Sequence, residues 1–287
     1  MTTISDWTIT GAEGEPILGN CHRPDDRPRG VIIIAHGFKG YKDYGMLPRI
    51  AHECARGGLI AHRFNFSHSG MTNDIETFAR PELFEQDTWN KEVFDLRMVI
   101  DAVARGDVAG QGLPSVLLGH SRGGVTVLLT AGRYADDRSF AQPMGIITVA
   151  SPSRCNSLSD EEAKELLAQG HLVSPSARTG QPLRIGRAFL QEQLDYPHAH
   201  DLLAIASRIR CAALMIHGSE DDTVDPAAAE ELRRATGERS NSRIIDGADH
   251  VFNAPNPMAL DAEPSPQLAE LLSVVGHFAT SVCDMAG

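Results

Sequence analysis

The chain has 287 residues, of which 42% are hydrophobic, and a formal net charge of −12 at pH 7. This length fits one large α/β domain or two small ones, and the apolar content can fill a core without help from disulfides or metal. The acidic balance argues against nucleic acid and against an anionic membrane surface as partners, because proteins that bind phosphates concentrate Lys and Arg.

The cysteines and the N-terminal sequence indicate the cellular compartment in which the protein is expected. The five cysteines are scattered, odd in number and without CxxC spacing, which indicates a reducing environment and no disulfide framework. The opening "MTTISDWTIT" has neither the basic nor the apolar region of a signal peptide. No apolar run reaches the roughly 18 residues of a membrane helix. We therefore expect a cytoplasmic protein, and we leave a homo-oligomer open.

The predicted elements alternate along the chain. "WTIT", "GAEGEP" and "ILGNCHRP" in the first thirty residues predict an antiparallel hairpin at a sheet edge. Continuous apolar runs then indicate strands buried on both faces, and helical patterns lie between them. The strands are expected at 31–36, 59–66, 115–120, 144–150, 211–218 and 242–246, and the helices at 87–104, 122–135 and 226–236. This order predicts an α/β fold with a mostly parallel central sheet flanked by helices.

One segment breaks the alternation. Residues 152–205 are polar, carry helical patterns at 157–170 and 184–194, and contain no strand-like run. The segment is too long for an ordinary connection and too structured for a linker. We predict a helical cap insertion at 152–205, with the core formed by 1–151 and 206–287.

A candidate nucleophile lies in "LLGHSRGG" (117–124). Ser121 sits in a G-x-S-x-G motif between a predicted strand and a predicted helix, where a sharp turn projects its hydroxyl from the sheet edge. The plain alternative is a polar turn that joins the two elements. A serine nucleophile also needs a base and an acid that orients the base.

The base and the acid are selected by position, since the chain holds 12 histidines. His250 in "DGADHVF" follows the last predicted strand. Asp221 and Asp222 in "HGSEDDTVDP" follow the strand before it, and the residues alone leave both as candidates. A buried carboxylate there is costly unless an imidazole N–H pairs with it. Along the chain the serine comes first, the aspartate second and the histidine third, which is the order of nucleophile, acid and base in one known fold.

The chain resembles the α/β-hydrolase superfamily from about residue 28 to its C-terminus. The matching pieces are "IIIAHGFKG", "RFNFSHSG", "LLGHSRGG", "MIHGSEDDTV" and "GADHVF". In that family the motif H-G-x-x-D-x-x-V carries the acid, which implies Asp221. The resemblance also implies an oxyanion hole formed by the backbone N–H groups of Phe38 and Arg122. It implies a structural role for His36 and no cofactor.

The same resemblance points to a class of reaction. The motifs are similar to those of small carboxylesterases and cinnamoyl esterase-type members, so we expect a serine hydrolase that cleaves small to medium carboxylic esters through an acyl-enzyme. A peptidase, thioesterase or amidase on the same triad, and a cofactor-free lyase or perhydrolase, are alternatives. A non-catalytic binding protein is the least favoured. His68 is a weak candidate for a second base, and the pair His198 and His200 a weak candidate for a metal site.

Overall fold

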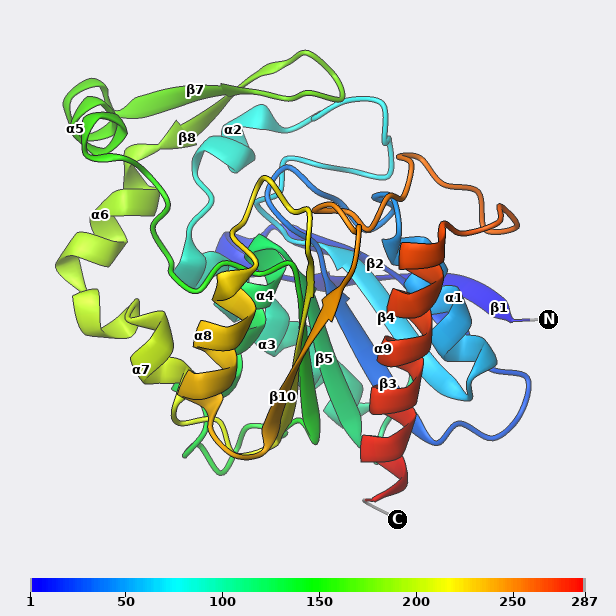
Figure 1. Ribbon diagram of the computed structural model, residues 1–287. Helices are drawn as coiled ribbons and strands as arrows, with labels where there is room; N and C mark the ends of the chain where they lie inside the picture. Colours follow the sequence, from blue (N-terminus) through cyan, green and yellow to red (C-terminus); the bar gives the residue numbers. More distant parts are fainter. Residues whose placement is uncertain (1, 286–287) are drawn as a thin grey trace.

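A computed structural model describes residues 2–285. Its centre is an eight-stranded sheet in the order β1-β2-β4-β3-β5-β6-β9-β10 (Figure 1). All strands from β4 to β10 in this order run parallel, and β1 and β2 are antiparallel at one edge. The strands are β1 (Thr3–Thr10), β2 (Pro16–Arg23), β3 (Gly30–Ala35), β4 (Leu59–Asn65), β5 (Ser115–His120), β6 (Gly145–Val149), β9 (Ala212–Gly218) and β10 (Ser240–Ile245). The edge hairpin and the parallel sheet are both as predicted.

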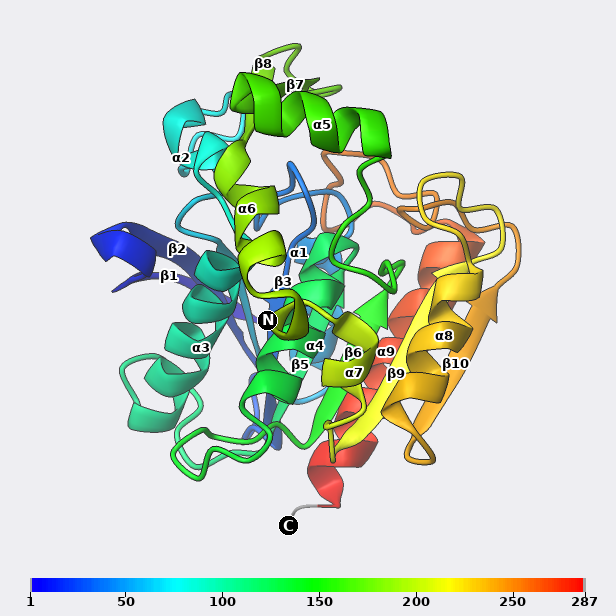
Figure 2. The same cartoon turned by 90° about the vertical axis from the view of Figure 1, so that its left-hand side faces the viewer.

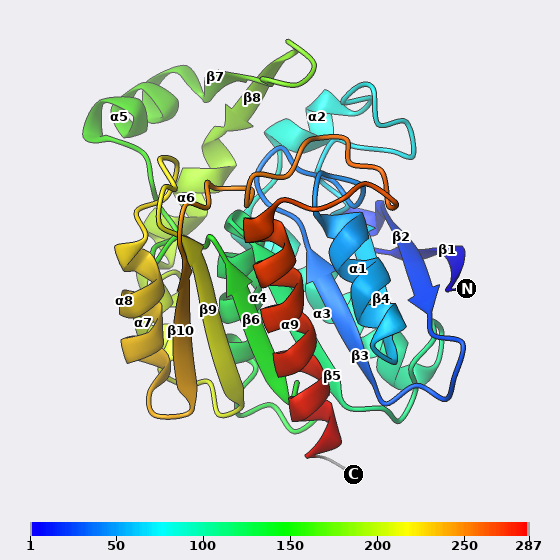
Figure 3. The same ribbon diagram turned by 45° about the vertical axis from the view of Figure 1, so that its right-hand side comes forward.

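Helices cover both faces of the sheet because its central strands are apolar on both sides. In β3, Val31 and Ile33 join a core with α3 (Trp89–Arg105), α4 (Arg122–Arg133) and α8 (Ala227–Thr236). The alternate residues Ile32 and Ile34 join a second core with α1 (Leu47–Arg56) and α9 (Pro266–Asp284). Figure 3 shows α1 and α9 in front of the sheet, with α3 and α4 behind it. The period of two along a strand thus produces the three-layer arrangement.

Residues 152–205 lie over the carboxyl ends of the parallel strands and descend along one side of the core (Figures 1 and 2). Their elements are α5 (Asp160–Gln169), β7 (His171–Pro175), β8 (Pro182–Gly186), α6 (Arg187–Asp195), a 3-10 turn (Pro197–Ala199) and α7 (Leu202–Ala206). The antiparallel hairpin β7–β8 corrects the expectation of a segment without strands. Each strand has five residues and few of them are buried, so neither forms a continuous apolar run.

The hairpin is fixed to the loop that follows β4. The Gln181 side chain accepts a hydrogen bond from Phe78 N (2.8 Å) and donates one to Phe78 O (3.2 Å). Leu183 is buried in a cluster with Tyr41 and Phe84, close to α2 (Pro81–Glu85). These contacts hold the hairpin above the loops at the carboxyl edge. No helix within residues 2–285 is both long and apolar enough to cross a bilayer.

Candidate active site

Ser121 occupies a strained turn between β5 and α4. Its φ of 53° and ψ of −122° lie where few residues other than glycine are found. The turn is tight: a Cβ on Gly119 would lie 2.1 Å from Gly123 O, and one on Gly123 would lie 2.5 Å from Ala35 O. Glycine is therefore required at both positions. The backbone geometry is that of a nucleophile elbow.

Two backbone N–H groups lie beside this turn. Arg122 is the first residue of α4, so its N–H has no acceptor within the helix. Phe38 lies in the loop after β3, and a Cβ on Gly37 of that loop would lie 3.0 Å from Ser121 Cβ. Within residues 2–285, no group accepts a hydrogen bond from Phe38 N or Arg122 N. Both N–H groups therefore lack an acceptor within the described residues.

His36 holds the loop that carries Phe38. Its Nδ1–H donates to Gly37 O (2.9 Å), and its Nε2 accepts from Phe66 N (3.3 Å). Burial lowers the pKa of His36, which keeps the ring neutral and able to serve as donor and acceptor at once. This is the structural role that the sequence predicted for it.

The predicted acid and base are in direct contact. His250 Nδ1–H donates to Asp221 Oδ2 (2.8 Å), whereas Asp222 is exposed on the surface. Asp221 accepts two further hydrogen bonds, since its Oδ1 accepts from Thr223 N and Val224 N, each at 2.9 Å. Its Oδ2 also lies 3.0 Å from His217 Nε2, which is 3.0 Å from Val224 O as well. Burial alone would raise the pKa of Asp221, but the bonds from His217 and His250 lower it below its usual range. Asp221 is therefore a carboxylate that can orient the His250 ring.

His120 connects the elbow to the His250 loop. Its Nε2–H donates to His250 O (3.0 Å), and the two ring centroids are 5.0 Å apart. Burial, reinforced by His250, lowers the pKa of His120 to about 3, so this ring is neutral. Within the described chain, no hydrogen bond joins Ser121 Oγ to His250. The structure thus brings the acid and base together and places the base next to the elbow.

Ser121 opens into a pocket of about 430 Å³ beneath residues 152–205. Its wall contains Phe38, Arg122 and Trp89 from the core together with Ile185 and Phe189 from the overlying segment. The volume lies within the range of about 300–1,000 Å³ that small-molecule sites occupy. The pocket can hold a small molecule with one group against Ser121.

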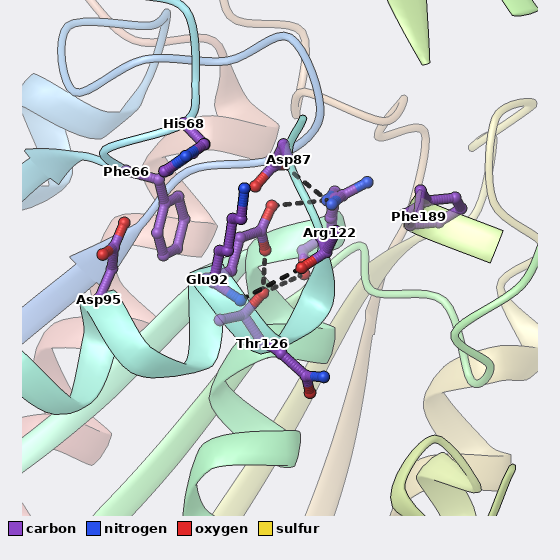
Figure 4. Close-up of polar contacts among 12 residues, drawn as sticks. Phe66, His68, Asp87, Glu92, Asp95, Arg122, Thr126 and Phe189 are labelled. Carbon is purple, nitrogen blue, oxygen red and sulfur yellow. Dashed lines mark hydrogen bonds and ion pairs between the residues drawn. The ribbon is translucent and has the colours of Figure 1, made fainter. Parts of the chain in front are cut away.

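A buried charged cluster supports the elbow from below. Arg122 Nε donates to Glu92 Oε1 (2.6 Å) and Nη2 donates to Asp87 Oδ2 (3.0 Å), while Thr126 Oγ1 also donates to Glu92 (Figure 4). Burial and the Glu92 carboxylate raise the pKa of Asp87 well above its usual range. Arg122 therefore pairs with Glu92 and with a second carboxyl group, Asp87, that tends to hold a proton.

The weaker candidates have structural contacts of their own. His68 is buried, with Nδ1 2.9 Å from Ser67 Oγ and Nε2 3.2 Å from Glu13 Oε2, and it does not line the Ser121 pocket. His200 Nδ1–H donates to Tyr196 O (2.9 Å), and its Nε2 lies 3.4 Å from Glu192. His68 and His200 therefore make polar contacts with neighbouring residues outside the Ser121 pocket.

Sequence reasoning missed several groups that support the site. Glu92 follows Trp89 by three residues and precedes Leu96 by four, so a charge on the apolar face of a predicted helix was a visible signal. His217 precedes Asp221 by four residues in the same motif. Asp87 carried no signal: it is the first residue of the helix predicted at 87–104, it precedes the observed start of that helix at Trp89, and it meets Arg122 only through the fold.

Comparison with known proteins identifies the family of the chain. The chain matches the alpha/beta hydrolase family over residues 32–263 and belongs to it. It is 22% identical over 278 residues to a monoacylglycerol lipase of Mycolicibacterium smegmatis, covering 88% of this chain and 93% of that one.

Solved structures share the fold. The esterase domain of a Rhodothermus marinus protein superposes with a TM-score of 0.64 at 21% identity, covering 97% of this chain and 98% of that one. Est1E from Butyrivibrio proteoclasticus, solved with ferulic acid bound, superposes with a TM-score of 0.70 at 16% identity, covering 95% and 97%.

Proposed function

We propose that the protein is a serine hydrolase that cleaves small to medium carboxylic esters through an acyl-enzyme. The observation that carries this proposal is the combination at the elbow: a strained Ser121, two N–H donors without acceptors, and the hydrogen-bonded pair of Asp221 and His250. The esterase and lipase names of the similar proteins support the same class of reaction.

The first half-reaction acylates Ser121. Its oxygen attacks the ester carbonyl carbon while His250 Nε2 takes the hydroxyl proton. The carbonyl oxygen becomes an oxyanion held by Phe38 N–H and Arg122 N–H, each worth about 3 kcal/mol of barrier. The C–O bond to the alcohol then breaks, and the His250 proton passes to the leaving oxygen.

The second half-reaction returns the free enzyme. Water attacks the acyl carbon and gives its proton to His250, and the carboxylic acid leaves as Ser121 regains that proton. Asp221 stays ionised and stabilises the imidazolium in both halves. We further propose that residues 152–205 act as the cap that shapes the acyl pocket, and that the protein works in the cytoplasm without a cofactor.

Hydrolysis of p-nitrophenyl esters from acetate to decanoate tests this proposal. We expect turnover that is greatest for short or medium chains and that is lost in Ser121→Ala. Ser207→Ala, a serine at the exposed end of α7, is the matched control and should behave like wild type. Turnover that persists in Ser121→Ala, or its absence for every ester, would refute the serine mechanism.

A further inference from the structure

The pocket wall next to Ser121 presents a guanidinium nitrogen without an acceptor. Arg122 uses Nε for Glu92 and Nη2 for Asp87, but Nη1 has no hydrogen-bond acceptor in the described part of the chain. Figure 4 shows one nitrogen of Arg122 directed away from both carboxylates, on the side of Phe189. Since Arg122 lines the pocket, this donor is placed to meet a ligand.

Aromatic rings frame that guanidinium. Its carbon lies 4.4 Å from the ring centroid of Trp89, 4.8 Å from that of Phe189 and 5.7 Å from that of Phe38. These contacts hold the guanidinium plane in place and keep water from it, which strengthens any hydrogen bond that it makes. All three rings line the same pocket.

Trp89 packs the guanidinium from the side of α3. The residue is 3% exposed, and its indole Nε1 is buried without a hydrogen-bond partner among residues 2–285. Because this N–H has no surface open to the pocket, Arg122 Nη1 is the donor that the wall presents to a ligand.

A further cation lies on the same pocket. Arg154 lines it, is exposed, and forms no ion pair within the described chain. The acidic lining residue, Asp225, already accepts a hydrogen bond from Ala227 N at the start of α8. Arg154 therefore differs from Arg122, whose guanidinium already pairs with Glu92.

We propose that the pocket selects esters whose acyl chain ends in a carboxylate, that is, monoesters of dicarboxylic acids. The carboxylate accepts a charge-assisted hydrogen bond from Arg122 Nη1. Arg154 is the second cation of the pocket wall and can attract the same carboxylate. This inference rests on the proposed ester hydrolysis at Ser121.

Two isosteric substrates test the inference on the full-length protein. Monophenyl adipate carries a terminal carboxylate, and phenyl 6-methylheptanoate carries an isopropyl group of the same shape at that position. We expect kcat/KM to be at least about tenfold higher for the adipate, the factor that one charge-assisted hydrogen bond supplies. A ratio of one or less overturns the inference.

A variant then locates the selectivity. Arg154→Met should lower the ratio of the two kcat/KM values by about tenfold. Arg184→Met is the matched control, because it removes a cation from the same segment outside the pocket, and the wild-type ratio should remain. An unchanged ratio in Arg154→Met overturns the inference.

A binding measurement separates this inference from the proposed reaction. Calorimetry of Ser121→Ala with each ester should give a Kd about tenfold lower for monophenyl adipate. Equal affinities overturn the carboxylate selectivity even where esters are hydrolysed. If the wild type hydrolyses no ester but Ser121→Ala binds monophenyl adipate selectively, the proposed reaction is overturned and the carboxylate site is supported.

Discussion

The buried pair of carboxylates around Arg122 predicts that Asp87→Asn stabilises the protein increasingly as the pH rises. Arg122 donates to both Glu92 and Asp87, and burial together with Glu92 raises the pKa of Asp87 well above its usual range. A native state that holds a proton which the unfolded chain has lost becomes less stable with rising pH. Asparagine carries no titrating proton, and its amide oxygen can still accept from Arg122 Nη2.

The magnitude follows from linkage. The unfolded Asp87 loses its proton near pH 3.9, so wild type should lose about 1.4 kcal/mol relative to the variant for each pH unit above that value. Between pH 5 and pH 7 the difference should grow by about 2.7 kcal/mol while the native Asp87 keeps its proton. It should level off once the native Asp87 ionises.

Urea unfolding followed by tryptophan fluorescence, at half-unit steps from pH 4.5 to 8, measures this difference. Asp107→Asn is the control, since Asp107 is an exposed acid paired with Arg105, and its profile should stay parallel to wild type. Glu92→Gln should destabilise the protein and reduce the slope, because it removes the charge that raises the pKa of Asp87. Parallel profiles for Asp87→Asn and wild type would refute the assignment of the proton to Asp87.

Three further substitutions test the residues that shape the turn at Ser121 and support the His250 ring. Gly123→Ala places a Cβ 2.5 Å from Ala35 O, so the free energy of unfolding should fall by at least about 3 kcal/mol in urea titrations; a smaller loss contradicts the tight crossing. Asp221→Asn should lower kcat by about 10⁴-fold with an unaltered circular dichroism spectrum, since the His250 ring loses its orienting carboxylate; wild-type kcat would exclude Asp221 as the acid. His217→Leu should lower kcat about tenfold at constant KM, while His217→Gln should restore part of the rate by returning an N–H donor beside Asp221 Oδ2 and Val224 O; equal rates in both variants would argue against a role for that donor.

Local patterns predicted most of the fold because the parallel strands are continuous apolar runs and their turns carry glycine. The elbow was predicted from Gly119, Ser121 and Gly123 at the junction of a predicted strand and a predicted helix, and the choice of Asp221 over Asp222 followed from the resemblance. The hairpin β7–β8 escaped prediction because its stability comes from contacts with distant residues, such as Gln181 with Phe78.

The supporting groups of the site were harder to predict than its principal residues. The contact of Arg122 with Asp87 spans 35 residues, and that of Trp89 with Phe189 joins α3 to the overlying segment. Such pairs leave no periodic signal in a single sequence. Only the folded chain brings them together.

A crystal structure of the protein after reaction with a fluorophosphonate tests the central claim most directly. We predict a phosphorus–oxygen bond to Ser121 Oγ, with one phosphonyl oxygen about 2.7–3.1 Å from both Phe38 N and Arg122 N. An unmodified Ser121, or an adduct whose oxygen meets neither N–H group, would contradict the account.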